Sequence, residues 1–342
     1  MTGYFVRRLL LIVPTFIGIT LAAFLIMHFV PGGPIERQIM AYKMAMAQEA
    51  GGASLGQFGT EIPPEALEEM RRFYGFDKPV HIRYATWLWN VLHLDLGRSY
   101  TYQDPVWDVI KSRFPVSIFL GLTGFVLSYL VCVPLGVFKA VLHRSKFDFF
   151  SSFVVFLGYS VPGWALGTVL LVLFGGGTFW SVFPLGGFRP ENWEYLTFVE
   201  KVSAQIEHMF LPVVCYMVGS FATLTILTKN SLMENLGQDY VRTAFAKGLG
   251  ERRVIFVHAL RNSLIPIATG LGHVFSLILA GSFLIERVFN IDGMGYLGYT
   301  SILQRDYPVA LGILVISSLL MLIGNIISDV IYVVVDPRIR FR

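Results

Sequence analysis

The sequence predicts an all-α membrane protein with six transmembrane helices, and three observations support this fold class. The 342 residues are 54% hydrophobic and only 15% charged, whereas soluble proteins carry roughly 25% charged residues. Several apolar runs reach about 20 residues, the length that a helix needs to cross a bilayer. Alternating strands of a membrane barrel are absent from the sequence, so helices must satisfy the backbone hydrogen bonds in lipid.

Six apolar runs are the expected spans, at about 9–30, 117–137, 150–174, 209–227, 264–285 and 309–335. The first run follows Arg7 and Arg8 and is too long for the core of a signal peptide, so we expect it to remain as a span. Cys132 and Cys215 fall inside apolar runs. Small core residues are expected there rather than a disulfide, a metal site or a nucleophile.

Positive charge beside the spans predicts their orientation. One side has only four cationic residues in its short loops, which are Arg189, Lys201, Arg287 and Arg305. The other side holds Arg7, Arg8, Lys139, Arg144, Lys146, Lys229, Arg242, Lys247, Arg252, Arg253, Arg261, Arg338, Arg340 and Arg342. Cytoplasmic loops carry the excess of Lys and Arg, so both termini are expected in the cytoplasm. Orientation explains the net charge of +4, and no nucleic acid partner is expected.

The spacing of the spans predicts three regions. These are an N-terminal transmembrane helix over 1–30, an outer loop with helices over 31–115, and a five-helix core over 116–342 with a cytoplasmic loop at 229–262. Within the outer loop, 41–60 has the composition of a linker, whereas Pro64 and Glu65 suit the start of a helix. A second helix is expected over 79–93. Its Trp87 and Trp89 fit either the membrane surface or packing against the protein, and both interpretations stay open.

Proline, glycine and ionisable residues inside the spans are candidates for function. Pro162 and Gly163 predict a bend in the third span, which is either a tolerated kink or a device that shapes a translocation path. Asp329 is expected to pair with a basic loop or a neighbouring helix, and His28 to lie at the membrane interface. His273 is expected to be a satisfied core histidine. Glycines between 290 and 298 predict tight turns near the outer mouth.

A polar insert of about 35 residues separates the fourth and fifth spans. Ser231 and Glu234 fit a capping box for an opening helical turn, and Asp239 fits the N-cap of a second helix. The apolar face expected for this second helix consists of Tyr240, Val241, Ala244, Phe245 and Gly248.

Two glycines predict the end of that second helix. Gly248 and Gly250 can both end it in left-handed geometry, and Glu251 then restarts a helix that continues to Asn262. A surface helix that packs on its own protein or lies among lipid headgroups has the same pattern as one that touches a partner.

The run 240–249 resembles the EAA loop of binding-protein-dependent ABC importer permeases, in its peptide-importer form. The resemblance covers nearly the whole chain, through Tyr4–Leu10, Pro31–Pro34, Tyr74–Pro79, Asp95–Ser99, His258–Asn262 and Val335–Arg340. The long first loop, and the pairing of Pro31–Pro34 with Leu227–Ser231, are most similar to the Yej-type branch, which is associated with peptide and microcin C uptake.

Two departures from the general motif stand out. Arg242, Thr243 and Ala244 occupy the positions of a glutamate and two alanines, and Arg261 occupies that of a proline, which here follows at Pro266. Both departures are typical of the peptide-importer subgroup.

The resemblance implies a type I ABC importer permease fold in the bacterial inner membrane. The implied partners are a second homologous permease that completes a heterodimer, two ATPase subunits or one fused ATPase, an external peptide-binding protein, and membrane lipid. The implied ATPase-coupling helix contains Tyr240, Arg242, Thr243, Ala244, Lys247, Gly248, Leu249 and Glu251. The resemblance assigns no substrate-binding residue, and no metal site is expected.

The sequence lacks a Walker A pattern, so the chain itself is not expected to be an enzyme or to bind ATP as a cofactor. The partner subunits would bind ATP instead. The alternative function is a stand-alone secondary peptide transporter. That class needs internal repeats and ion ligands near the midplane, and neither is evident in the sequence.

Overall fold

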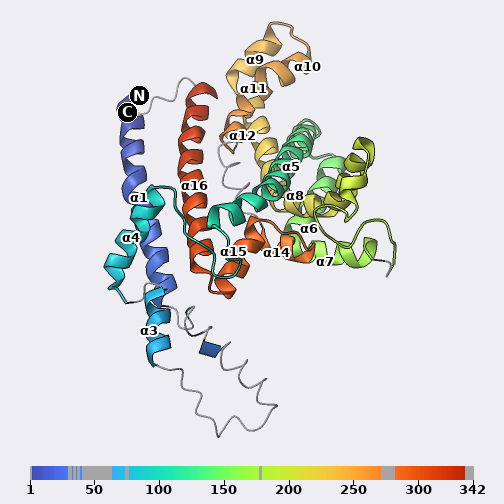
Figure 1. Ribbon diagram of the computed structural model, residues 1–342. Coiled ribbons are helices and arrows are strands. Elements are labelled where there is room, and N and C mark those ends of the chain that lie inside the picture. The colour runs from blue at the N-terminus through green and yellow to red at the C-terminus, as the bar shows by residue number, and fades with distance from the viewer. Residues whose placement is uncertain are drawn as a thin grey trace. The chain divides into compact units, whose positions relative to one another are not determined.

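The computed structural model describes residues 2–29, 33, 36, 39–40, 64–73, 77–176, 179–270 and 282–335. In these residues helices are the regular structure, and β-pairing is limited to two isolated bridges. The all-α prediction is therefore confirmed (Figure 1). Three sequence features lie outside the described residues. They are the expected linker at 41–60, His273 and the Pro31–Pro34 motif apart from Gly33.

The helices run in the order α1 (Thr2–Phe29), α3 (Pro64–Phe73), α4 (Val80–Leu92), α5 (Val106–Val141), α6 (Lys146–Ser160), α7 (Gly163–Phe174), a 3-10 turn (Trp193–Tyr195), α8 (Phe198–Leu236), α9 (Asp239–Ala246), α10 (Glu251–Arg253), a π-helix (Val254–Ala259), α11 (Leu260–Ser263), α12 (Ile265–Thr269), α14 (Phe283–Val288), α15 (Met294–Leu303) and α16 (Tyr307–Val335). The start of α3 at Pro64 confirms the predicted helix opening.

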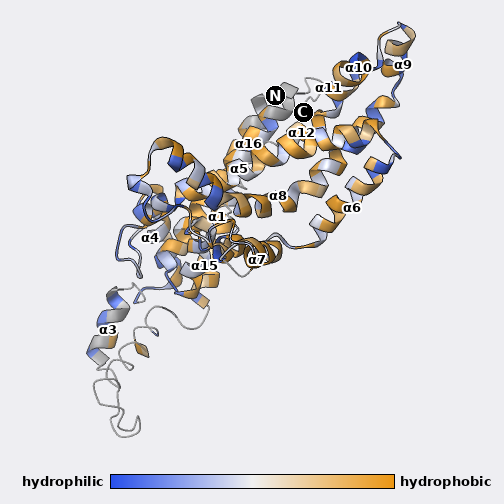
Figure 2. Cartoon of the chain, turned by 90° about the vertical axis from the view of Figure 1, so that its right-hand side faces the viewer, coloured by the Kyte–Doolittle hydropathy of each residue, from blue (hydrophilic) through white to orange (hydrophobic). Residues whose placement is uncertain are grey.

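Four helices of the described residues are long and apolar enough to cross a membrane, at Val6–Phe29, Val106–Val141, Phe198–Leu236 and Tyr307–Val330. Helices α6 and α7 meet the same test as a pair, bent by 98° at the break between them. Most of the predicted fifth span lies at 271–281, outside the described residues. The count of six spans therefore stays a prediction. Figure 2 shows long hydrophobic stretches along α5, α6 and α8.

The chain divides into two compact units. The first comprises 1–11, 113–297 and 319–342, and the second comprises 12–112 and 298–318. The three regions predicted from the sequence, 1–30, 31–115 and 116–342, were drawn from the order of the spans and not from contacts. They stay a prediction.

In the second unit, α4 packs along the C-terminal half of α1. The Tyr84 hydroxyl lies 3.0 Å from the Thr20 hydroxyl, and the rings of Tyr84 and Trp87 approach Phe24 at 5.4 and 5.7 Å between centroids. Trp89, by contrast, is 64% exposed. Packing against the protein is therefore confirmed for Trp87, whereas Trp89 faces outward and its contact with the membrane surface stays a prediction.

In the first unit, a buried cluster joins α5, α8 and α14 through Leu120, Met209, Leu211, Val213, Cys215, Ile285, Phe289 and Ile291. Cys132 and Cys215 are free and buried, as predicted. Near the chain ends, Asp329 forms an ion pair with Arg8 and accepts a hydrogen bond from the Tyr4 hydroxyl at 3.2 Å. The expectation that Asp329 pairs with a neighbouring helix is confirmed.

The glycine-rich stretch after α14 is only partly a set of turns. Asn290 has a left-handed φ of 49°, which fits the predicted turn. From Met294 the chain is helical as α15, so tight turns over all of 290–298 were a wrong prediction. The glycines there permit close approach instead, because a Cβ at Gly293 would lie 2.7 Å from the Glu286 carboxyl group.

Candidate functional site

Helix α8 continues without interruption through the predicted capping box. Ser231 and Glu234 both lie inside α8, which ends only at Leu236, so the predicted helix start there was wrong. The Ser231 hydroxyl instead donates to the Ser263 carbonyl at 2.9 Å. This bond ties the end of α8 to α11, and it satisfies the hydrogen-bonding capacity of a buried hydroxyl.

Helix α9 begins one residue earlier than a cap at Asp239 requires. Gln238 has extended backbone and is the N-cap, whereas Asp239 is the first helical residue. The Asp239 carboxylate lies 3.4 Å from the Arg242 guanidinium, with both side chains strongly exposed. An acidic side chain in the first turn suits the positive end of the helix, although such an exposed pair contributes little stability.

The buried face of α9 is narrower than predicted. Val241 and Ala244 are 1% and 6% exposed and pack against one cluster, whose other buried members are Val137, Ala140, Leu232, Val254 and Ala259. Tyr240 and Phe245 are 39% and 47% exposed, so their place on the apolar face was wrong. The cluster includes residues of α5 and α8, so it joins α9 to both long helices.

Gly248 ends α9 in the predicted left-handed conformation, with φ of 78°. Its N–H donates to the Phe245 carbonyl at 2.9 Å, and the N–H of Leu249 donates to the Ala244 carbonyl at 3.3 Å. These two bonds form a Schellman motif, and Leu249 packs on the cluster beneath α9. Gly250 has φ of −63° as the N-cap of α10, so the left-handed prediction was wrong there.

Residues 239–253, from here the α9–α10 segment, present a basic outer surface. Its exposed cations are Arg242, Lys247, Arg252 and Arg253, against the carboxylates of Asp239 and Glu251. The Tyr240 hydroxyl donates to the Asn235 side chain at 2.7 Å and so ties α9 to the end of α8. Figure 1 shows α9 and α10 beyond α11 and α12, far from α7 and α14. Such a surface suits a partner with acidic groups and an apolar groove.

A buried ion cluster, missed from the sequence, joins α5, α6 and α8. The Asp148 carboxylate accepts hydrogen bonds from Lys229 at 2.7 and 2.8 Å and lies 3.1 Å from the Lys139 ammonium. Lys139 is 1% exposed and also donates to Ser151 and Ser152. The sequence signal was Asp148 in the first turn of an apolar helix, between two span-flanking lysines.

The two sequence-predicted bend residues lie where α6 gives way to α7. Pro162 is the N-cap of α7 and Gly163 its first residue. A Cβ at Gly163 would lie 2.7 Å from the Cys215 carbonyl oxygen, which is closer than real Cβ contacts. The bend therefore depends on proline to stop α6 and on glycine to let α7 approach α8.

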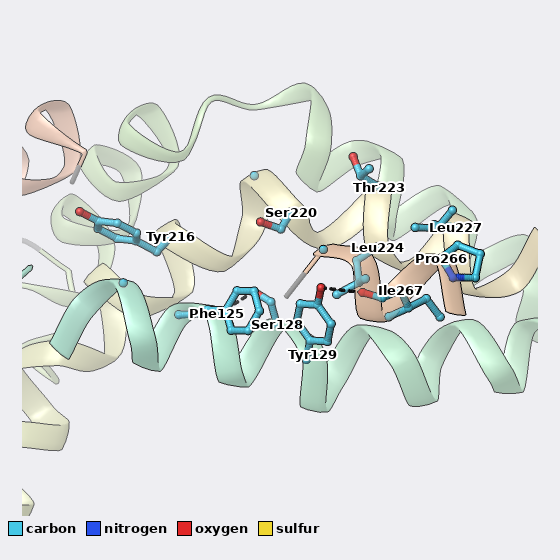
Figure 3. Close-up of a pocket in the computed structure, with 14 residues that line it drawn as sticks. Phe125, Ser128, Tyr129, Tyr216, Ser220, Thr223, Leu224, Leu227, Pro266 and Ile267 are labelled. Atoms are coloured by element: carbon cyan, nitrogen blue, oxygen red, sulfur yellow. Dashed lines mark hydrogen bonds between the residues drawn. The ribbon is translucent and has the colours of Figure 1, made fainter. Parts of the chain in front are cut away.

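A cavity of about 450 Å³ lies between α5 and α8. Small or hydroxyl-bearing residues recur along both helices at helical spacing, namely Gly121, Gly124 and Ser128 on α5 and Gly219, Ser220 and Thr223 on α8. The Tyr129 hydroxyl, also in the lining, donates to the Ile267 carbonyl at 3.1 Å (Figure 3). The missing side-chain volume opens the space, and hydroxyl groups supply neutral hydrogen-bonding positions.

One end of this cavity leads to a buried carboxyl group. Tyr216 lines the cavity, and its hydroxyl accepts from the Ser282 N–H at 2.7 Å and donates to Glu286 at 3.3 Å. Glu286 is fully buried and accepts from the Tyr296 N–H at 2.7 Å. Burial raises the pKa of the Glu286 carboxyl, and the backbone N–H donors oppose that shift in pKa.

Comparison with known proteins adds the evolutionary context. Residues 132–341 match the family model of the binding-protein-dependent transport system inner membrane component. The chain is 39% identical to the peptidoglycan transport system permease protein YejB of Agrobacterium fabrum, over 100% of this chain and 99% of that protein. It is equally similar, at 39%, to the inner membrane ABC transporter permease protein YejB of Escherichia coli O157:H7, with both chains fully covered. The dipeptide transport system permease protein DppB of Escherichia coli K12 is 34% identical, again over both full lengths.

Proposed function

The chain belongs to the family of binding-protein-dependent transport system inner membrane components, and we propose that it forms half of a pore that imports peptides or peptide-like compounds, driven by a separate ATPase. It is a membrane permease of the ABC peptide-transport type, most similar to the Yej branch. The proposal concerns the direction of transport, the cargo and the coupling. A microcin C-like cargo is part of this proposal.

The exposed surface of the α9–α10 segment is the observation that carries the coupling proposal. Val241 and Ala244 hold one side of α9 against the protein, which leaves Arg242, Phe245 and Lys247 facing outward. A half-exposed phenylalanine among cations gains stability if a partner covers it. We therefore assign this segment to ATPase docking, with Phe245 as the apolar anchor.

The packing beneath α9 supplies a route for the movement. Closure of the ATPase dimer would displace α9, and the Val241–Ala244 cluster would pass that displacement to α5 and α8. The Asp148 ion cluster then links both helices to α6. A bend at Pro162 lets α6 and α7 change their angle without unfolding either helix, which is hinge motion of a kind common in transporters.

The cavity between α5 and α8 is our candidate for the lining of the translocation path. Its hydroxyls, including those of Ser220 and Thr223, can bond to peptide groups, which every peptide offers. Tyr129 and Tyr216 add aromatic surface for varied side chains. A neutral lining of this kind fits cargo of mixed sequence better than a single charged substrate.

The proposed assembly contains a second, homologous permease, two ATPase subunits or one fused ATPase, and an external peptide-binding protein. We also propose that this chain binds no nucleotide, that both its termini lie in the cytoplasm, and that lipid surrounds the spans. The second candidate function is a secondary transporter that works alone. Accumulation of peptide by this chain alone in liposomes, without ATP, would establish that second function and refute the first.

Co-purification tests the docking surface directly. We would express the chain with its partner subunits and replace Phe245 with Ala, with Phe198→Ala as a matched control, since Phe198 is an exposed phenylalanine at the opposite end of α8. Truncating an anchoring aromatic costs about 2 kcal/mol, or about 30-fold in affinity. We expect the ATPase to be lost from Phe245→Ala and retained by Phe198→Ala. Full retention in both variants would contradict docking through α9.

A further inference from the structure

The cavity between α5 and α8 has two unlike ends. Its lining residues on α8 run from Tyr216 to Leu227. Tyr216 lies about 20 residues before the last residue of α8, Leu236, which is about 30 Å along the helix. Figure 3 shows Tyr216 at one end of the lining, and Leu227 with Pro266 at the other. We call the Tyr216 end the distal end, because it is the end farther from α9.

The distal end is narrow because α5 and α8 approach each other there. A Cβ at Gly124 would lie 3.1 Å from the Tyr216 Cβ, which is tighter than ordinary van der Waals contact. Next to this point, Leu120 of α5 and Cys215 of α8 belong to one buried cluster that also contains Phe289. The side chains that close the distal end therefore include one from the chain after α14.

Residues 286–296, from here the 286–296 segment, are tied to α8 by one tyrosine. The Tyr216 hydroxyl donates to the Glu286 carboxyl at 3.3 Å and accepts from the Ser282 N–H at 2.7 Å. The same carboxyl accepts from the Tyr296 N–H at 2.7 Å. Glu286 therefore holds the two ends of the segment together and joins them to the lining of the cavity.

The 286–296 segment is tied to α5 as well. The Met294 N–H donates to the buried Ser117 hydroxyl at 2.8 Å. One turn earlier on α5, the Arg113 guanidinium forms an ion pair with Asp292 at 2.7 Å. The segment is thus bonded to both helices that border the cavity, and all of these residues belong to the unit 1–11, 113–297 and 319–342.

We propose that the 286–296 segment is the gate at the outer end of the translocation path, and that Glu286 is the positioning residue that holds it shut through Tyr216. This inference rests on the proposed function, which assigns the path and its outer side. Cargo from outside can enter only if α5 and α8 separate at the distal end. A segment bonded to both helices must then release one of them.

The release takes place at α8. On that side a single phenol makes the polar contacts, and its bond to Glu286 is the longest of those described above. On the α5 side an ion pair and a buried hydrogen bond act together. Glu286 itself stays bonded to Tyr296 when the gate opens, so the segment moves as one piece. Glu286 touches no cargo in this role.

The test measures access to the cavity from each side of the membrane. The full importer is prepared in right-side-out and in inside-out membrane vesicles, without ATP or cargo. The reporter is Ser220→Cys, about one turn from Tyr216 in the cavity lining, and the probe is a membrane-impermeant maleimide. Cys132 and Cys215 are buried, and the importer without the reporter gives the background labelling.

The key variant is Tyr216→Phe, which keeps the ring and removes the hydroxyl. A hydrogen bond to a carboxyl group shifts an equilibrium about tenfold, and a neutral one about fivefold. Labelling of a mostly closed gate follows its open fraction. We therefore expect labelling from outside to rise about tenfold in Tyr216→Phe and about fivefold in Ser117→Ala. The control Tyr159→Phe should match the wild type, because Tyr159 is exposed on α6 outside the cavity lining.

A double variant tests whether the phenol acts through the carboxyl. Adding Tyr216→Phe to Glu286→Ala should raise labelling by much less than tenfold, because the bond between them is already lost. An undiminished tenfold rise overturns Glu286 as the positioning residue. Thermal unfolding reports whether each variant is folded, and Tyr216→Phe alone decides the gate if Glu286→Ala is not.

Two outcomes overturn the gate itself. One is equal labelling of the wild type and a folded Tyr216→Phe variant in right-side-out vesicles. The other is an equal rise in inside-out vesicles, which a general loosening of the helices would cause. Because labelling needs neither ATP nor cargo, failure of peptide uptake by the wild-type importer would count against the proposed function and leave the labelling result standing.

Discussion

Gly248 offers the sharpest test of the α9–α10 segment, because its role separates backbone conformation from side-chain contact. The residue has φ of 78°, and a Cβ built there would meet no atom within 4 Å. Gly250, two residues on, is equally uncrowded but has an ordinary φ of −63°. Replacing each glycine with alanine therefore compares two changes of identical size that differ in backbone strain.

The free-energy cost of replacing Gly248 follows from its left-handed backbone conformation. A left-handed residue with a Cβ costs about 1–2 kcal/mol relative to glycine. The cost favours release of the Gly248 and Leu249 N–H groups from the carbonyls at the end of α9. Since 1.4 kcal/mol is about tenfold in an equilibrium constant, the docked conformation becomes about 5- to 30-fold less favoured. Asparagine tolerates this region better than alanine, and valine tolerates it worse.

The assay is peptide uptake and ATP hydrolysis by the importer reconstituted in liposomes, with the external binding protein supplied. We expect uptake to fall in the order glycine, asparagine, alanine and valine at position 248, with Gly248→Val uncoupling hydrolysis from transport. Membrane insertion should be unaffected. Gly250→Ala should transport normally, because its backbone accepts alanine without strain.

The outcome that refutes this reasoning is equal activity of Gly248→Ala and Gly250→Ala, whether both are active or both inactive. If both are inactive, contact between the glycine surface and a partner would be limiting instead of the helix end. If Gly248→Asn is no better than Gly248→Val, left-handed geometry is not the requirement.

Three further predictions concern the helices behind this segment. Gly163→Ala sets a Cβ 2.7 Å from a backbone oxygen of α8, so we expect thermal unfolding to show a loss of about 1–3 kcal/mol, whereas Gly158→Ala meets no atom within 4 Å and should be neutral or stabilising. Asp148→Asn leaves buried Lys139 without its counter-charge, and denaturant unfolding should show about 3 kcal/mol less stability. Glu286→Gln removes a carboxyl whose pKa is raised by burial. The protonated form stabilises the folded wild type below the unfolded pKa of about 4.3, and this stability is lost as the pH rises through the raised pKa. The wild type should therefore lose melting temperature relative to the variant as the pH rises, and parallel profiles would contradict the argument.

The sequence was sufficient for features that depend on neighbouring residues alone. Apolar runs predict α1, α5, α8 and α16 because crossing a bilayer requires a continuous length of apolar helix. Pro162 predicts an interruption of the helix because proline has no backbone N–H to donate, which is also a property of the local sequence. The size of the bend was not predictable, because it depends on how closely Gly163 approaches a carbonyl of another helix.

The helix end after α9 shows where local reasoning stops. Gly248 and Gly250 can both adopt positive φ, so composition alone cannot choose between them. Burial of Leu249 on the cluster beneath α9 makes the choice, and this contact involves α5 and α8. The Asp148 cluster was missed for the same reason, since three separate helices create it.

Two contacts with α8 give the distance between the start of α6 and the loop that follows α7. Asp148 at the start of α6 bonds to Lys229, and the Gly187 carbonyl lies 3.1 Å from the His208 ring nitrogen. His208 and Lys229 are about six turns apart on α8, or about 31 Å, which matches the hydrocarbon thickness of a bilayer. The bent pair therefore has the length of one broken span, in agreement with the predicted third span. As a single crossing it would make α5 and α8 run in the same direction, and the polar segments that follow both helices would then emerge on one face of the membrane.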